Sequence, residues 1–380
     1  MSLRTFLCTV LAMLSVQLVA SQPVTPPFQY LISMMATPSG DTIYSVLQVD
    51  THSNKIKILI SLPEDTVPSV ATAWDRGADF TTQSLVSVRN GSIERVVPDD
   101  HALYPLKYIT CPKNKDYNAT GFAPSSPLLA NTTTNRLYGT CQGGGPGGGG
   151  TVYALNPVTN GLTVLHAFIK DKSRKANVPA YPTSGPLALL GNRLYGITIN
   201  GGQHSAGVIY SLREDGTGFK VNYSLANKQR LPIGLYASKS RLYGLYLTAH
   251  RYDPVLFCYS PSSQGIRTVS KLDHFGMDSM GQPTPRFLEV APHTLVILAG
   301  TLRKGHLLLQ VDTCTGKQTV LHDFRPRWLT DVVCDSGSYY VSGYNPFKQR
   351  GFVYRVTANT CTKLATVLYI HHTVKVIPVK

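Results

Sequence analysis

The sequence lacks any long apolar run beyond its first twenty residues. The run from Phe6 to Ala20 follows Arg4 and ends in small residues. It is about 15 residues long, whereas a membrane-spanning helix needs about 20. This pattern is typical of a secretory signal peptide over residues 1–21. We therefore expect residues 22–380 to form one exported domain, secreted and extracellular, with no membrane span.

Acidic residues are also scarce. The chain has 21 Asp and Glu against 36 Lys and Arg. The adjacent pair Asp99 and Asp100 cannot face one substrate from an extended strand, because neighbouring side chains point to opposite faces. Glycoside hydrolysis needs two facing carboxylates. The sequence thus predicts no catalytic residue, and carboxylates from distant segments keep a secreted polysaccharide hydrolase or lyase as the alternative.

Zinc motifs such as C-x-x-C are missing, so we expect no metal site and no cofactor. One cysteine, Cys8, lies in the signal peptide, which leaves an even set of six: Cys111, Cys141, Cys258, Cys314, Cys334 and Cys361. An even set in an exported chain favours disulfides. Cys111 with Cys141 is one candidate pair. Cys314 with Cys361 is another, and Cys334 competes for either partner.

Four N-x-[ST] sequons predict N-glycosylation at Asn90, Asn118, Asn131 and Asn222. The formal net charge is +15, and the basic residues are spread along the chain. That spread argues against a nucleic-acid-binding arm. A basic exterior suits an acidic glycan or protein partner, and a merely soluble surface is an equal alternative. The oligomeric state is not predicted.

No segment shows a sustained helical period, and the chain is instead an internal repeat. Residues 124–168 and 182–225 share the frame P-L, N-R-L-Y-G, a glycine-rich gap, V-x-Y-x-L and an apolar tail. Three looser copies follow. One anchoring glycine marks each copy: Gly139, Gly196, Gly244, Gly300 and Gly343.

Each copy is expected to form four short strands. In the second copy these are 186–190, 193–199, 208–213 and 219–225. Four antiparallel strands every ~45–50 residues are the signature of a β-propeller blade. We predict an all-β fold: a single propeller of seven blades, with six or eight as alternatives.

Both chain ends are predicted to complete one blade. The sequence LQVDT occurs at 47–51 and again at 309–313, so both segments resemble a third strand. Only one strand, 28–36, precedes the first of them. We expect the C-terminal segment 373–380 to supply the missing innermost strand and to close the ring, which removes free sheet edges. A compact blade is expected at 67–99.

The stretch CQGGGPGGGG at 141–150 raises the question of a phosphate loop. A phosphate loop would need Gly-Lys-[Ser/Thr] leading into a helix, whereas here a strand is expected to follow. A linker does not fit either, since both flanks belong to one copy. We interpret the stretch as an irregular turn between two strands.

The frame R-L-Y-G-x-T, glycine-rich gap, T-V-Y-x-L-N-P resembles the tandem repeat of the "choice-of-anchor GloVer-type" secreted proteins. The matching residues here are 137–140, 143–150 and 151–155, and then 194–198 and 207–212. The resemblance implies a propeller-like β repeat in an extracellular setting. It carries no established catalytic residues.

A binding face is predicted in the longer loops between second and third strands, where aromatic and basic groups could contact sugars or acidic groups. Its members are Tyr246, His250, Arg251, Tyr252, Tyr344 and Lys348. Histidines at the ends of fourth strands (His166, His274 and His322) are interpreted as repeated structural residues beside a phenylalanine rather than as ligands. The function we expect is a secreted, glycosylated, non-enzymatic protein that binds a glycan or a protein.

Overall fold

The computed structural model describes strands and turns along most of the chain. The described residues are 28–36, 42–50, 56–63, 70–74, 84–89, 92–97, 102–108, 119–124, 128–131, 133–170, 179–182, 187–238, 240–249, 253–272, 287–301, 305–335, 337–345, 350–367 and 369–374. For the residues up to 108, only the backbone and its strand pairing are described. All regular elements within these ranges are β-strands, which confirms the all-β prediction. In this part of the chain no helix has the length and apolarity to cross a membrane.

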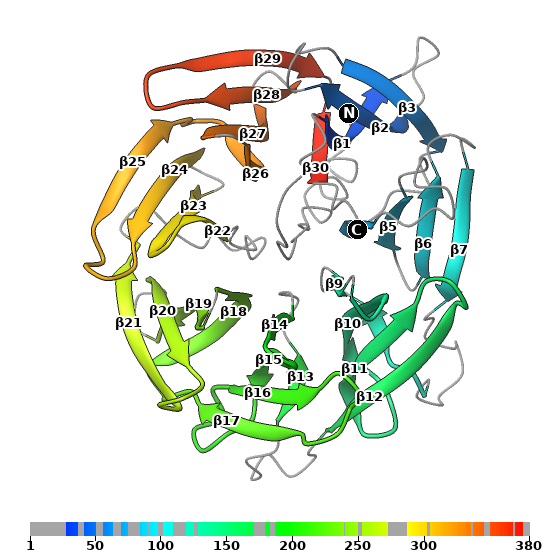
Figure 1. Ribbon diagram of the computed structural model, residues 1–380, viewed down its shortest axis with the longest axis vertical. Coiled ribbons are helices and arrows are strands. Elements are labelled where there is room, and N and C mark those ends of the chain that lie inside the picture. The colour runs from blue at the N-terminus through cyan, green and yellow to red at the C-terminus, as the bar shows by residue number, and fades with distance from the viewer. Residues whose placement is uncertain are drawn as a thin grey trace, which may run out of the picture. The chain divides into compact units, whose positions relative to one another are not determined.

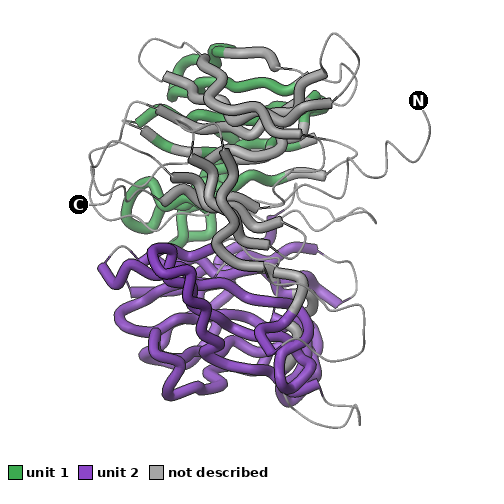
Figure 2. The backbone as a smooth tube through the Cα atoms, turned by 90° about the vertical axis from the view of Figure 1, so that its right-hand side faces the viewer, with its two compact units in different colours: residues 1–89, 95–104, 274–380 green, residues 90–94, 105–273 purple. Residues whose placement is uncertain are grey.

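The strands form antiparallel sheets that follow one another in chain order (Figure 1). The chain divides into two compact units, which Figure 2 colours separately. The second unit, residues 90–94 and 105–273, holds three complete sheets. Their strands are β8 (Phe122–Pro124), β9 (Leu129–Asn131), β10 (Arg136–Gly143), β11 (Gly148–Asn156) and β12 (Gly161–Ile169); β13 (Ala180–Pro182), β14 (Ala188–Leu190), β15 (Arg193–Asn200), β16 (Val208–Arg213) and β17 (Lys220–Ser224); and β18 (Gln229–Ala237), β19 (Leu242–Thr248), β20 (Pro254–Ser260) and β21 (Gly265–Lys271).

The first unit also holds three complete sheets. They consist of β1 (Phe28–Ala36), β2 (Thr42–Asp50), β3 (Ile56–Pro63) and β30 (Tyr369–Val374); β22 (Phe287–Ala291), β23 (Thr294–Thr301), β24 (Gly305–Asp312) and β25 (Gln318–Asp323); and β26 (Trp328–Asp335), β27 (Ser338–Asn345), β28 (Arg350–Val356) and β29 (Cys361–Val367). A further sheet contains β4 (Val70–Trp74), β5 (Ser84–Arg89), β6 (Ser92–Val97) and β7 (Ala102–Tyr108), and its residues are shared between the units.

The strands predicted for the second repeat copy are confirmed as β14 to β17. One feature was not predicted: the first strand is split, so that β13 and β14 both pair with β15. Pro182 lies opposite Thr198 and Ala188 opposite Tyr195, which leaves more residues on the first strand than on its partner between these points. The pairing with β15 is therefore not one continuous ladder. The preceding sheet splits its first strand in the same way, into β8 and β9.

The terminal strands pair with each other. β30 is an edge strand of the first sheet and runs antiparallel to β1, with Tyr30 opposite Val374 and Ile32 opposite His372. A strand from the C-terminal end was expected there, but its predicted start at residue 373 is wrong. His371 and His372 lie inside the strand because pairing with β1 already begins at Tyr369.

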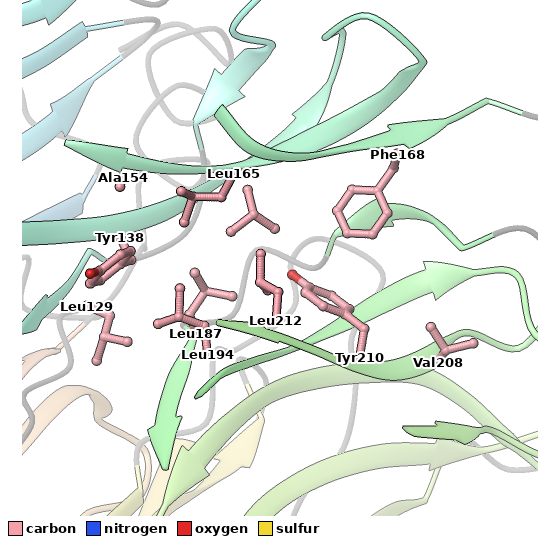
Figure 3. Close-up of a cluster of buried hydrophobic side chains, with 11 residues drawn as sticks. Leu129, Tyr138, Ala154, Leu165, Phe168, Leu187, Leu194, Val208, Tyr210 and Leu212 are labelled. Atoms are coloured by element: carbon pink, nitrogen blue, oxygen red, sulfur yellow. The ribbon is translucent and has the colours of Figure 1, made fainter. Parts of the chain in front are cut away.

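The core lies between successive sheets, where one sheet face packs on the next (Figure 3). Between the sheets of β10 and β15, Tyr138, Leu165 and Phe168 contact Leu194 and Tyr210. Along β16, Val208, Tyr210 and Leu212 pack against the preceding sheet, and Ile209, which alternates with them, packs against the following sheet. A sheet that is covered on both faces needs central strands that are apolar on both sides, and β19 and β20 have this character.

The anchoring glycine of the repeat has a packing role. Gly139 lies opposite Tyr153 and Gly196 opposite Tyr210, and each ring covers its glycine. A Cβ at Gly196 would overlap the Tyr210 ring. The same cross-strand position holds Phe257 beside Gly244, His306 beside Gly300 and Phe352 beside Gly343. Glycine is therefore required where an aromatic ring must lie flat across the neighbouring strand.

Candidate functional site

The two glycine-rich connections adopt one conformation. In the first, Gly150 N–H donates to the Gly144 carbonyl at 3.0 Å, and in the second, Gly207 N–H donates to the Gly201 carbonyl at 3.0 Å. Gly150 and Gly207 both have φ of +99°, in the left-handed region. A side chain at either position would strike a carbonyl oxygen of the preceding strand. Each connection leads into a strand, which confirms the interpretation as a turn.

Carboxylates in the described residues stabilise turns and join neighbouring sheets. Glu214 Oε2 accepts hydrogen bonds from Asn131 Nδ2 at 2.7 Å and from Tyr138 Oη at 2.6 Å. Burial and the Glu214 hydrogen bond raise the pKa of Tyr138 to about 12. Because Glu214 follows β16 while Asn131 ends β9, this carboxylate links two successive sheets.

Three aspartates, Asp215, Asp312 and Asp323, have similarly local partners. Asp215 accepts from Thr217, and Asp312 accepts from the backbone N–H groups of Cys314 and Thr315. Asp323 forms an ion pair with Arg325 at 2.6 Å. Hydrogen bonds to the charged form lower the pKa of all three carboxyl groups. These three carboxylates therefore stabilise the turns in which they lie.

The predicted binding face is only partly described. Tyr246 lies in β19 and not in a loop, so its predicted position is wrong. Its side chain is 8% exposed and stacks on Phe257 with ring centroids 5.8 Å apart. The alternation along β19 directs it into the core, and no sequence pattern marked where β19 ends. Tyr344 lies in β27, opposite Gly351, so its predicted position in a loop is also wrong. His250, Arg251, Tyr252 and Lys348 lie outside the described residues.

The fourth-strand histidines are packed against aromatic rings, in agreement with the structural interpretation. The His166 ring stacks on Phe219 with centroids 3.7 Å apart, and burial lowers its pKa to about 4. His322 contacts Phe324 edge-on at 4.5 Å. His274 lies outside the described residues. Among the residues described, no three His, Cys, Asp or Glu side chains gather where they could hold a metal ion.

One buried histidine was not singled out in the sequence. His306 in β24 is 6% exposed, and its Nδ1 accepts a hydrogen bond from the Leu329 N–H of β26 at 3.0 Å. Burial lowers its pKa to about 4, so the ring is neutral at pH 7. A neutral ring is what an accepting Nδ1 requires. Its place opposite Gly300, where other copies have Tyr or Phe, was the available signal.

The cysteines that the structure describes form no disulfide with one another. Cys334 in β26 and Cys361 in β29 lie at the same level of one sheet, separated by the paired residues Tyr339 in β27 and Val356 in β28. Three strand spacings separate their Cα atoms by roughly 14 Å, twice the limit for a disulfide. The pairing of Cys334 with Cys361 is therefore wrong. Cys111 lies outside the described residues.

The other cysteines differ in exposure. Cys141 and Cys258 are buried, and burial raises the pKa of both thiols, that of Cys141 to about 12. Cys314 is exposed in the turn after β24. The predicted pairing of Cys314 with Cys361 is not formed in the structure.

Two of the four sequons lie in described segments. The Asn131 side chain is engaged at both ends, because its Oδ1 accepts from the N–H groups of Thr133 and Thr134 while its Nδ2 donates to Glu214. Asn222 lies on the outer strand β17, and its Nδ2 donates to the Lys220 carbonyl at 3.4 Å. Asn90 and Asn118 lie outside the described residues.

These features define a class: an all-β protein of four-stranded antiparallel sheets, in which neighbouring sheets within a unit pack face to face like the blades of a propeller. Solved structures support it. Puromycin hydrolase (S511A mutant complexed with PGG) is 10% identical with a TM-score of 0.58, over 93% of this chain and 57% of that one. A puromycin-hydrolyzing peptidase of Mycobacterium tuberculosis is 13% identical with a TM-score of 0.55, over 97% and 58%.

A third similar structure is that of a nidogen/laminin complex, at 12% identity and a TM-score of 0.48, over 77% of this chain and 97% of that one. The chain spans less than two thirds of either puromycin-hydrolysing enzyme. At these identities the likeness shows the fold alone. Comparison with curated protein sequences finds no match.

The repeat itself identifies the family. Residues 79–306 match the Gloeobacter/Verrucomicrobia repeat, and the match covers more than half of the chain. The chain belongs to the Gloeobacter/Verrucomicrobia repeat family, as the resemblance in the R-L-Y-G frame predicted.

Proposed function

We propose that this protein is a secreted, glycosylated, non-enzymatic binding protein whose partner is an extracellular acidic glycan. The observation that carries the proposal is that acidic side chains are used in hydrogen bonds within the fold, whereas basic side chains are exposed. Glu214 and the turn aspartates Asp215, Asp312 and Asp323 stabilise the fold, whereas basic side chains such as Arg213 and Lys220 are exposed to solvent. With a net charge of +15, the molecule attracts polyanions.

The proposal includes the number of blades and the closure of the ring. A single propeller of seven blades, closed by strands from both chain ends, would present its loops as one rigid surface. The pairing of β1 with β30 and the seven sheets formed by the described strands support it. Small-angle scattering tests the closed ring, since two separately moving units would give a larger radius of gyration than one compact domain of this length.

Binding to an array of neutral, carboxylated and sulfated glycans at physiological salt tests the function. We expect binding to a narrow acidic set that weakens as salt rises, because exposed charges are screened. A lack of glycan binding together with cleavage of a polysaccharide would contradict the proposal and favour the hydrolase or lyase. Retention of neutral glycans alone would contradict the charge argument.

A further inference from the structure

Three basic side chains gather on one face of the sheet formed by β13 to β17. Arg193 in β15 lies directly opposite Arg213 in β16, and Ser211 in β16 lies opposite Lys220 in β17. Opposite residues share a face, and so do residues two apart along a strand. Arg193, Arg213 and Lys220 therefore lie on the same face, at one end of the adjacent strands β15, β16 and β17.

Arg193 is held in place by groups that do not neutralise it. Its Nε donates to Ser211 Oγ at 3.1 Å, and its Nη2 donates to the Gly218 carbonyl at 2.5 Å. Ser211 itself is buried, with 1% exposure. The guanidinium thus has a fixed position beside Arg213 while keeping its full charge.

Nearby acids compensate this charge only in part. Glu214 accepts its hydrogen bonds from Asn131 and Tyr138 of the preceding sheet. Asp215 binds Thr217 within its own turn, and the charge of Arg213 makes a smaller contribution to lowering its pKa. Within the described residues, none of the three basic groups forms an ion pair; the pair formed there joins Arg325 and Asp323.

Like charges placed directly opposite each other in a sheet destabilise it. Two arginines and a lysine around one serine are therefore costly without a ligand, and they match the oxygens of a sulfate group, which guanidinium groups bind through paired hydrogen bonds. We propose that Arg193, Arg213 and Lys220 bind a sulfate group of a sulfated glycan. This site rests on the proposed function and names the class of its ligand.

The test compares two double variants of the full chain with equal loss of charge. Arg213→Gln with Lys220→Gln removes two of the site's charges and leaves the anchored Arg193. Lys317→Gln with Lys363→Gln removes two exposed charges elsewhere. Calorimetry at physiological salt measures binding of a heparin oligosaccharide and of its desulfated form, and thermal unfolding checks that both variants fold.

We expect the site variant to bind the sulfated form roughly tenfold more weakly, because hydrogen bonds to charged groups are lost. The control variant should change by less than about twofold, as surface charges act weakly at a distance. Equal weakening of both variants, or equal binding of the desulfated form, would overturn the site while leaving acidic-glycan binding intact. Failure of the unaltered protein to bind any acidic glycan would overturn the site together with the proposed function.

Discussion

Tyr210 and His306 occupy the same place in two copies of the repeat, yet their polar atoms have different partners. Both stand directly opposite the anchoring glycine of the neighbouring strand, Gly196 and Gly300 respectively. The Tyr210 hydroxyl is buried without a hydrogen-bond partner, whereas His306 Nδ1 accepts from Leu329 of the next sheet. The comparison teaches that the repeat requires a flat ring at this position. Whether the polar atom of that ring forms a hydrogen bond differs from copy to copy.

The largest effect should come from the glycine that both copies share. In Gly196→Ala the new methyl group overlaps the Tyr210 ring and approaches Leu187. Overpacking of this kind destabilises by about 3 kcal/mol. Urea unfolding measures it, with Gly265→Ala as control because the atoms nearest to a Cβ at Gly265 lie at ordinary contact distance, 3.7 Å. Equal stability of both variants would show that the glycine is not a packing requirement.

His306→Phe should have the next largest effect. Phenylalanine stands at this position in two other copies, but it leaves the buried Leu329 N–H without its acceptor. We expect a loss of about 2 kcal/mol in the free energy of unfolding. His322→Phe is the control. His322 packs edge-on against Phe324, and a phenylalanine can keep such a ring contact, so this variant should be nearly neutral. An unchanged stability in His306→Phe would mean that the hydrogen bond contributes nothing.

The same histidine predicts a pH dependence. Its pKa is about 4 in the folded protein and about 6.5 in the unfolded chain. The unfolded chain therefore binds the proton first, and stability falls as the pH drops from about 6.5 to about 4. His166 contributes in the same window. Unfolding measured across this range should show a shallower decline in His306→Phe, and identical declines would contradict the assignment.

A smaller loss is expected at the link between the sheets of β10 and β15. Asn131→Ala removes the hydrogen bond to Glu214 and the turn acceptor, and should cost about 1 kcal/mol. Thr133→Ala abolishes the same sequon but keeps the Asn131 amide, so it should be nearly neutral in urea unfolding. Equal losses in the two variants would mean that glycosylation, and not the hydrogen bonds, stabilises this turn.

The smallest effect should be that of Tyr210→Phe. The hydroxyl removed has no partner, so we expect a change between zero and about 1 kcal/mol in the stabilising direction. Tyr138→Phe is the contrasting variant, since the hydroxyl of Tyr138 donates to Glu214 and its removal should destabilise. Urea unfolding of both variants would sharpen the distinction between a ring kept for shape and a ring kept for its polar atom.

Much of the fold could be predicted from the repeat. The alternation of apolar residues gave β14 to β17 with small errors, and the turn dipeptides separated them correctly. The match between 47–51 and 309–313 pointed to the strands at both ends. The split first strand could not be predicted, because it depends on which residues of β15 each half pairs with.

The candidate site was harder to predict than the fold. Tyr246 was placed in a loop because the end of β19 depends on where pairing with β20 stops. The group of Arg193, Arg213 and Lys220 is spread over 28 residues of sequence, and only the strand register brings it to one face. The pairing of distant side chains is a property of register, which no local pattern encodes.

The sequence by itself determined the strand-rich repeat, the glycine that each ring must cover and the excess of positive charge. These follow from local composition and periodicity, which act within a few residues. Only the tertiary structure decided which polar atoms find partners, that Glu214 binds Asn131 and that His306 binds Leu329. Such contacts join residues of different sheets, and their geometry is fixed only when the sheets pack face to face.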